Sequence, residues 1–294
     1  MRVWAGLLTI YLVWGSTYLG IRLMVETVPP LLGSGVRFLA AGAIFAAVLV
    51  ARRGVGALRV SRRELLSCAA VGTALLLGGN GLVAVAEQHV PSGLAALLIA
   101  SEPLWIVVFR RASGEPVGRA TALPVAAGFA GVALLFAPGE HPGHASVGGL
   151  LIVVAAAFFW AGGSFASSRL ALPRDPLRST AVQMLCGGAA MTAVSLVAGE
   201  GGDVRWSAIS AKSALAFAYL VVAGSLAAFT AYVWLLRHAP ISQVSTYAYV
   251  NPIVAIALGA VVLGEQVTPL VAAGAGIIVA SVAVTVRRER PAPA

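Results

Sequence analysis

Residues 89–104 read HVPSGLAALLIASEPL, and residues 238–253 read HAPISQVSTYAYVNPI. Each stretch opens with a histidine and a proline two residues apart and ends with a polar residue followed by proline, at a constant offset of 149 residues. A second pair of stretches, WGSTYLGIRL at 14–23 and AGGSFASSRL at 161–170, aligns at an offset of 147. The similar offsets predict that the chain is an internal duplication.

The composition places the chain among membrane proteins. Apolar residues make up 59% and charged residues 11% of its 294 residues, whereas soluble domains have about 45 to 50% and about 25%. The mean hydropathy is +0.92. A net charge of +9 does not indicate a nucleic-acid partner, because no water-exposed domain is available to carry a basic binding surface.

Ten apolar segments follow one another along the chain, and a helix needs roughly 20 apolar residues to cross the hydrocarbon core. The segments cover residues 3–23, 31–51, 65–86, 93–109, 121–136, 147–170, 177–197, 213–236, 242–263 and 268–286. We predict that residues 3–137 form a first repeat of five helices and residues 147–286 a second. The intervening stretch, with its Gly and Pro residues, is a linker, and residues 287–294 are a basic cytoplasmic tail.

The basic residues fix the expected orientation, because short cytoplasmic loops carry an excess of Arg and Lys. If the N-terminus is cytoplasmic, 16 of the 20 basic residues lie on the inner side. Removing any one span would place several of these clusters on the wrong side. The pattern predicts a multi-pass protein of the inner or plasma membrane with both termini in the cytoplasm.

Five spans in each half are an odd number, so the second half must enter the membrane inverted relative to the first. The predicted fold is an all-α membrane protein with ten transmembrane helices, arranged as two inverted five-helix repeats around a central cavity. Inverted repeats of this kind are typical of secondary transporters, whose sites lie between the repeats near the bilayer midplane.

Short motifs in both halves carry a resemblance to a known family. They are WGST at 14–17, PP at 29–30 with RFLAAG at 37–42, AEQ at 86–88 with PSG at 91–93, and NP at 251–252 with LGE at 263–265. In this order they resemble the EamA-type members of the drug/metabolite transporter superfamily, over nearly the whole chain. The resemblance implies a ten-helix fold and proton-coupled or facilitated movement, often export, of amino acids and other small metabolites. Family members commonly have a small or hydroxyl residue where this chain has Glu102.

Two ionisable residues, Arg37 and Glu102, lie clearly within predicted spans. A charge at the bilayer centre costs at least about 2.5 to 3.5 kcal/mol on insertion scales, so each invites a functional hypothesis. We expect Glu102 to bind a proton or a cationic substrate. The alternatives are structural: Arg37 and Glu102 pair with each other, or Arg37 extends to the interface.

Each of the two matched stretches has a proline inside its span. Pro103 lacks a backbone N–H and frees the carbonyl of Ile99, and Pro252 does the same for Ala248. Broken helices at a repeat interface are where transporter sites commonly form, so we predict hinges at Pro103 and Pro252. Helix kinking for packing alone is the competing explanation.

Polar and aromatic residues at helical spacing complete the predicted cavity. Singly, such polar groups more often join helices through hydrogen bonds than bind a ligand. The candidate lining residues, besides Arg37 and Glu102, are Trp14, Thr17, Tyr18, Asn80, Trp160, Ser164, Gln183, Gln243, Tyr247 and Asn251.

A glycine–glutamate pair follows a predicted span in each half, and places Glu115 and Glu265 at an offset of 150 residues. A carboxylate at such a place caps a helix N-terminus or pairs with a loop arginine. We expect these structural roles for both residues, in preference to substrate binding.

The sequence has no phosphate-binding GxxxxGK[ST] loop and no HExxH or GxSxG motif, so neither ATP hydrolysis nor a metal or cofactor site is indicated. We expect a secondary transporter that exports small metabolites such as amino acids or drug-like compounds. Its partners are the substrate, the lipid bilayer and possible coupling protons, and it acts as a monomer or homodimer. The alternatives are a membrane enzyme acting on a lipid or prenyl substrate, which would need clustered carboxylates or histidines, and a non-transporting scaffold.

Overall fold

The computed structural model describes residues 1–137, 145–239, 241–244 and 246–288. Every regular element within these ranges is a helix. Most of the predicted linker, and residues 289–294 of the predicted basic tail, lie outside the described residues. The prediction of an all-α protein is confirmed for the part of the chain that is described.

Eight helical runs among the described residues are long and apolar enough to cross a membrane. Five of them are single helices: α1 (Arg2–Met24), α2 (Pro30–Arg53), α8 (Val147–Ser167), α9 (Pro176–Val197) and α15 (Pro269–Arg288). The other three runs each consist of consecutive helical segments. The first contains α3 (Arg62–Gly72), η2 (Thr73–Gly81) and α4 (Leu82–Ala86), and the second contains α5 (Ser92–Ile99) and α6 (Glu102–Ala112). The third contains α11 (Ala211–Tyr219), η5 (Leu220–Ala227) and α12 (Ala228–His238).

Two further apolar helices occupy the remaining predicted positions but are shorter. They are α7 (Arg119–Leu134) and α14 (Tyr247–Leu263). At 1.5 Å per residue, 16 residues of α7 reach only about 24 Å, less than the hydrocarbon thickness of about 30 Å. Helix length therefore supports eight spans directly, and the count of ten stays a prediction. The remaining short elements are η1 (Val55–Leu58), α10 (Glu200–Asp203), η4 (Trp206–Ala208) and α13 (Ile241–Val244).

Three of the long runs contain irregular backbone. The run that holds Glu102 is interrupted at Ala100 and Ser101, directly before the Glu102–Pro103 pair. The segments η2 and η5 are π-helical and begin 147 residues apart, the same offset as the second pair of matched stretches, residues 14–23 and 161–170. Such π segments are frequent at functional sites.

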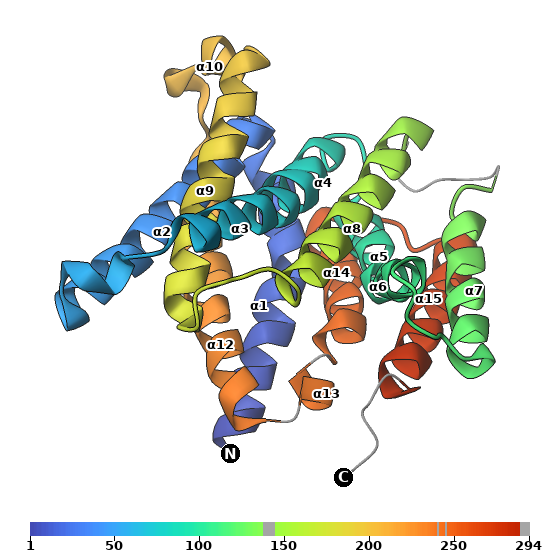
Figure 1. Ribbon diagram of the computed structural model, residues 1–294. Helices are drawn as coiled ribbons and strands as arrows, with labels where there is room; N and C mark the ends of the chain where they lie inside the picture. The colour runs from blue at the N-terminus through green and yellow to red at the C-terminus, as the bar shows by residue number, and fades with distance from the viewer. Residues whose placement is uncertain (138–144, 240, 245, 289–294) are drawn as a thin grey trace.

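Helices α1 and α15 place both ends of the described chain at the same end of the bundle. In Figure 1, α1 begins and α15 ends at the lower end of the bundle, which we call the near end. Helix α10 lies at the opposite, upper end, where α1 finishes, and we call this the far end. Helix α2 packs along α9, α15 along α7, and α1 lies between α14 and α12. A chain that begins and ends on the same side crosses the bundle an even number of times.

Small residues let the helices approach closely, as expected where lipid provides no hydrophobic force between helices. Gly35 of α2 faces Thr192 of α9, and Gly188 of α9 faces Leu39 of α2. Gly72, at the end of α3, lies against the backbone carbonyl of Gln183 in α9. These contacts leave no room for a side chain on any of the three glycines.

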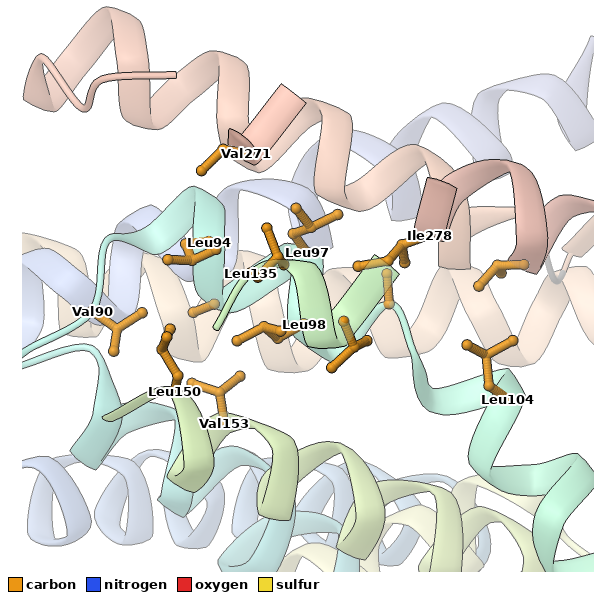
Figure 2. Packing of buried hydrophobic residues seen from close by; sticks show 14 of the residues in the cluster. Val90, Leu94, Leu97, Leu98, Leu104, Leu135, Leu150, Val153, Val271 and Ile278 are labelled. Atoms are coloured by element: carbon orange, nitrogen blue, oxygen red, sulfur yellow. The ribbon is translucent and has the colours of Figure 1, made fainter. Parts of the chain in front are cut away.

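The largest apolar cluster joins both halves of the sequence. Figure 2 shows Leu97 and Leu98 of α5, Leu104 of α6, Leu150 of α8 and Ile278 of α15 pointing into one space. These side chains are fully buried or nearly so. The interrupted α5–α6 run is therefore packed on several sides, and its polar break is held among apolar neighbours.

Two carboxylates cap helices at the far end. Glu200 of α10 accepts hydrogen bonds from the N–H groups of Leu31 (3.3 Å) and Leu32 (2.8 Å) at the start of α2. Glu265, in the turn before α15, accepts from the N–H groups of Ser92 (2.8 Å) and Gly93 (3.0 Å) at the start of α5. Each carboxylate satisfies otherwise unpaired N–H groups and complements the helix dipole. The capping role expected for Glu265 is confirmed.

Substitution of Gly72 by alanine is expected to destabilise the protein. The new Cβ would overlap the Gln183 carbonyl, a backbone atom that cannot rotate away. Overpacking of this kind typically costs about 1–3 kcal/mol. Thermal unfolding of the purified protein in detergent should show a lower Tm for Gly72→Ala.

Gly276→Ala in α15 is the matched control, because its Cβ would meet open space and alanine favours helix by up to about 1 kcal/mol. We expect an unchanged or higher Tm for this variant. Equal loss of stability in both variants would contradict the close α3–α9 contact.

Candidate functional site

A cavity of about 100 Å³ lies among the helices of the bundle. Its wall is built from α1, α2, η2, α4, α5, α6, α8, α12 and α14, so both halves of the sequence contribute. The lining residues are Trp14, Thr17, Tyr18, Ile21, Arg37, Phe38, Gly79, Asn80, Val83, Ile99, Glu102, Trp160, Phe229, Tyr247 and Asn251.

Arg37 of α2 lines this cavity and is only 3% exposed. Its Nε donates a hydrogen bond of 2.9 Å to the Ser225 hydroxyl of η5. The guanidinium carbon lies 4.6 Å from the centroid of the Phe38 ring. The Nη1 nitrogen has no hydrogen-bond partner, so a buried cation keeps an unused donor next to the cavity.

Glu102, at the first position of α6, lines the cavity and is 8% exposed. The hydroxyl of Ser164 in α8 donates to its Oε1 over 3.1 Å. The carboxylate sits where the backbone of the α5–α6 run is interrupted. A buried carboxyl group and a locally irregular backbone therefore meet at the cavity wall.

Arg37 and Glu102 share the cavity without forming an ion pair. Among the described residues, no salt bridge within 4.0 Å links their side chains. Arg37 also does not extend to the interface, since its side chain is buried against Ser225. The geometry thus contradicts both structural explanations considered for Arg37.

An aromatic cluster closes one side of the cavity around Trp14. The Trp14 ring contacts Phe229 with centroids 5.4 Å apart, and Tyr232 and Tyr247 at 5.2 Å each. The contacts with Phe229 and Tyr247 are edge-to-face, an arrangement that aromatic quadrupoles favour. The cluster gives the cavity rigid, apolar walls next to its two charged groups.

The π segments place polar groups at the cavity. A π-helix interrupts the regular hydrogen-bond ladder, and in η5 the carbonyl of Gly224 accepts a hydrogen bond of 3.2 Å from Trp14 Nε1. The next residue, Ser225, binds Arg37. In the first half, η2 brings Gly79 and Asn80 to the wall.

Helix α14 contributes Tyr247 and Asn251 to the cavity. With its amide nitrogen turned toward them, Asn251 donates to the carbonyls of Tyr11 and Tyr247 at 3.3 Å each. Pro252 lies inside α14, which runs without interruption from Tyr247 to Leu263. The two matched prolines therefore differ, because only Pro103 lies at a helix break in this conformation.

Three predicted site residues lie off the cavity wall. Ser164 is one layer behind it and touches Glu102. Gln183 of α9 donates to the Ser179 hydroxyl over 2.7 Å within its own helix. Gln243 belongs to the short α13, where its backbone carbonyl accepts from Thr246 at 2.5 Å. Only the tertiary arrangement separates these polar residues from those that line the cavity.

Several apolar lining residues were missed in the sequence. They are Ile21, Phe38, Gly79, Val83, Ile99 and Phe229. Ile21 follows Trp14 and Tyr18 at helical spacing, and Phe38 is adjacent to Arg37. Their positions beside predicted lining residues could have indicated that they also line the cavity. Ser225, the hydrogen-bond partner of Arg37, gave no such signal, because hydroxyl residues are common in membrane helices.

A charged bridge ties α6 to α8 at the near end. Glu115 accepts from Arg110 Nε over 2.6 Å and forms a second ion pair with Arg169. The Arg169 guanidinium stacks on the Phe165 ring with its carbon 3.6 Å from the centroid. The pairing expected for Glu115 is confirmed. A groove of about 540 Å³ beside this bridge is lined in part by Ser164, which also donates to Glu102.

The profile of the EamA-like transporter family matches this chain twice, at residues 3–137 and 147–287. The chain belongs to the EamA-like transporter family. Together with the eight membrane-length helices, this membership makes the protein a membrane transporter.

Relatives of this EamA-family chain include transporters named for location or cargo. The uncharacterized inner membrane transporter YedA of Escherichia coli (strain K12) is 37% identical over 284 residues, covering 96% of this chain and 90% of the relative. The probable amino-acid metabolite efflux pump of Salmonella typhimurium is 26% identical, with 95% and 93% covered. A solved crystal structure shares the fold with a TM-score of 0.64 at 23% identity and covers 96% of both chains.

Replacement of Glu115 by glutamine is expected to lower stability in a pH-dependent way. The hydrogen bond from Arg110, together with both arginine charges, holds the pKa of Glu115 below its ordinary range. The stabilisation is therefore complete above the ordinary carboxyl pKa and is lost as pH falls through the lowered value. The Tm difference between wild type and Glu115→Gln should be present at neutral pH and disappear in acid.

Arg111→Gln is the control, because it removes a charge at the same helix end and keeps Glu115 with both its partners. Its Tm difference from wild type should be smaller than that of Glu115→Gln at neutral pH. A difference for Glu115→Gln that stays constant from neutral to acidic pH would contradict the bridge.

Proposed function

We propose that this EamA-family protein exports small zwitterionic metabolites, such as amino acids, by alternating access. The observation that carries the proposal is the central cavity, in which a buried guanidinium and a buried carboxylate face the same space without pairing to each other. Buried charges are normally paired, because removing an ion from water is costly. A zwitterion supplies a partner for each.

The proposed topology is ten transmembrane helices in two inverted five-helix repeats, residues 3–137 and 147–286. Its support is the double match to the family profile and the two π segments at a 147-residue offset. The shorter helices α7 and α14 would complete the ten spans. The bilayer would be thinner around them, or neighbouring polar groups would contact their ends. Helix α1 begins and α15 ends at the near end, which we assign to the cytoplasm of a cell membrane, and we propose that the tail at 287–294 is cytoplasmic as well.

Within this cavity, Arg37 takes the substrate carboxylate and Glu102 the ammonium group. The unused Nη1 donor of Arg37 supplies a charge-assisted hydrogen bond. Trp14 and Tyr247 pack the substrate body. A cavity of about 100 Å³ is smaller than the roughly 300–1,000 Å³ of sites for drug-sized ligands, so it favours small metabolites over drug-like compounds.

Alternating access needs two flexible regions on either side of the site. The interruption before Pro103 allows α5 and α6 to move separately, and Pro252 is the matching hinge in the second half. Trp160, Asn80, Asn251 and the other predicted wall residues would contact the substrate in turn as the cavity opens. Gln183 and Gln243 are assigned to packing.

The partners that follow are the small-molecule substrate and the lipid bilayer, with protons as the proposed coupling ion through Glu102. Export is the proposed direction, supported by the name of the Salmonella relative, a probable amino-acid metabolite efflux pump. The protein would act as a monomer or homodimer, without a nucleic-acid partner.

Transport in proteoliposomes tests this function. We expect wild type to move radiolabelled glycine, L-alanine or L-serine faster than a cationic dye, and a pH gradient to increase the flux. Loss of one hydrogen bond to a charged group costs about 1.5–3 kcal/mol, which corresponds to an apparent affinity about 10- to 100-fold weaker in Arg37→Gln. Glu102→Gln should also lose the pH dependence.

Arg205→Gln is the charge-matched control, because Arg205 is an exposed residue between α10 and η4. Its flux should equal that of wild type. Amino-acid flux that is the same in wild type, Arg37→Gln and Glu102→Gln across a range of pH would overturn the proposed binding mode.

A further inference from the structure

Glu87 is a second buried carboxylate that is not among the residues lining the central cavity. It caps the end of α4 at the far end and is 0% exposed. Neither of its side-chain oxygens has a hydrogen-bond partner. Its chain neighbour Ala86 and nearby Val90 belong to the buried apolar cluster. The site described above makes no use of this residue.

The charged groups around Glu87 are already engaged elsewhere. Arg22 of α1 donates to the backbone carbonyl of Glu87 and not to its carboxylate. Glu265, in the turn between α14 and α15, binds the N-terminus of α5 through Ser92 and Gly93. Tyr18 of α1 is the other titratable side chain that interacts with Glu87 electrostatically. These three residues are the ionisable groups that face it from the described elements.

A carboxylate in this setting is stable as the neutral acid. An ionised carboxylate without a partner is strongly disfavoured in an apolar environment, and the group takes up a proton instead. Burial, and secondarily the Glu265 charge, raise the pKa of Glu87 well above its ordinary range, while Arg22 opposes them. The Glu265 carboxylate differs from that of Glu87, because it accepts hydrogen bonds from two backbone N–H groups.

The contact between Glu265 and α5 is a clamp that closes the far end. Glu265 Oε1 accepts from both the N–H and the hydroxyl of Ser92, at 2.8 and 2.9 Å, and Oε2 accepts from Gly93 N–H at 3.0 Å. Gly259 of α14 has no room for a side chain because Glu265 lies against it. The clamp thus joins the α5–α6 run, which carries Glu102, to the α14–α15 pair.

We propose that Glu87 is a proton-binding site that controls this clamp. With the proton in place, the neutral acid is not repelled by the Glu265 carboxylate, which lies within electrostatic range of it, and the far end stays closed. When water reaches Glu87, its O–H bond breaks, a water molecule takes the proton, and the electron pair stays on the carboxylate. Two like charges then face each other in an apolar setting, which weakens the hold of Glu265 on α5.

This inference rests on the proposed alternating-access cycle, in which the far end must open. It adds a titratable group that is separate from the substrate cavity, so that a proton taken up at Glu87 is not displaced by substrate bound at Glu102. The ligand is the proton alone, and the site can therefore be tested without knowledge of the transported compound.

Infrared difference spectroscopy of the purified protein in lipid nanodiscs tests the proton. Raising the pH should remove carboxylic-acid carbonyl bands, and one band should be absent from Glu87→Gln and retained in Glu102→Gln. Glutamine has nearly the shape of the neutral acid, so Glu87→Gln should fold. In Glu265→Gln, the Glu87 band should disappear at lower pH, because the neighbouring charge is removed. Identical carboxylic-acid bands in wild type and Glu87→Gln would overturn the proposal.

Hydrogen–deuterium exchange at the start of α5 tests the clamp in the same samples. Wild type and Glu87→Gln are compared at each pH, so that the intrinsic pH dependence of exchange cancels. We expect equal exchange in acid and about tenfold faster exchange in wild type at alkaline pH. Equal exchange at every pH would overturn the link between Glu87 and the clamp. Neither result depends on amino-acid transport, so failure of the proposed function is seen separately in the flux experiment.

Discussion

The bilayer interior offers no water, and this constraint explains most of the structure. Backbone groups must find partners inside the protein, so the chain forms helices throughout its described spans. Where the helices are irregular, the released groups are reused: the Gly224 carbonyl in η5 binds Trp14. Where helices begin at the far end, Glu200 and Glu265 satisfy the first N–H groups of α2 and α5. Irregular backbone is tolerated in membranes where it is buried in protein or lines a cavity.

The same constraint sorts the charged residues into three sets. Most basic residues lie in loops and at helix ends, where water or partners such as Glu115 are available. Arg37 and Glu102 remain inside, each with one hydrogen bond to a hydroxyl group and with a cavity between them. The Glu87 carboxylate is buried without a hydrogen-bond partner. Each burial is costly, and the cost is reasonable where the charge acts in binding or in conformational change.

Much of the architecture was accessible from the sequence because hydrophobic length, charge asymmetry and internal duplication are properties of the linear chain. The break before Glu102–Pro103 also followed, since proline cannot donate to the helix ladder. Pro252 shows the limit of that rule: the same residue type at the matched position lies in a continuous helix, because packing around α14 keeps the helix in place. The π segments were not predicted, since no residue type demands them.

The sequence alone determined that the chain is a helical membrane protein with two similar halves and a few buried ionisable residues, because a nonpolar solvent leaves little freedom in how such a chain can fold. The tertiary structure decided which polar residues meet. It placed Arg37 and Glu102 around one cavity but not in contact, and it moved Gln183 and Gln243 away from that cavity. It also brought Glu87 within electrostatic range of Glu265, which is 178 residues away in the sequence. The reason is physical: helical periodicity fixes the faces of one helix, whereas the faces that meet depend on how small residues such as Gly72 and Gly188 let several helices pack together.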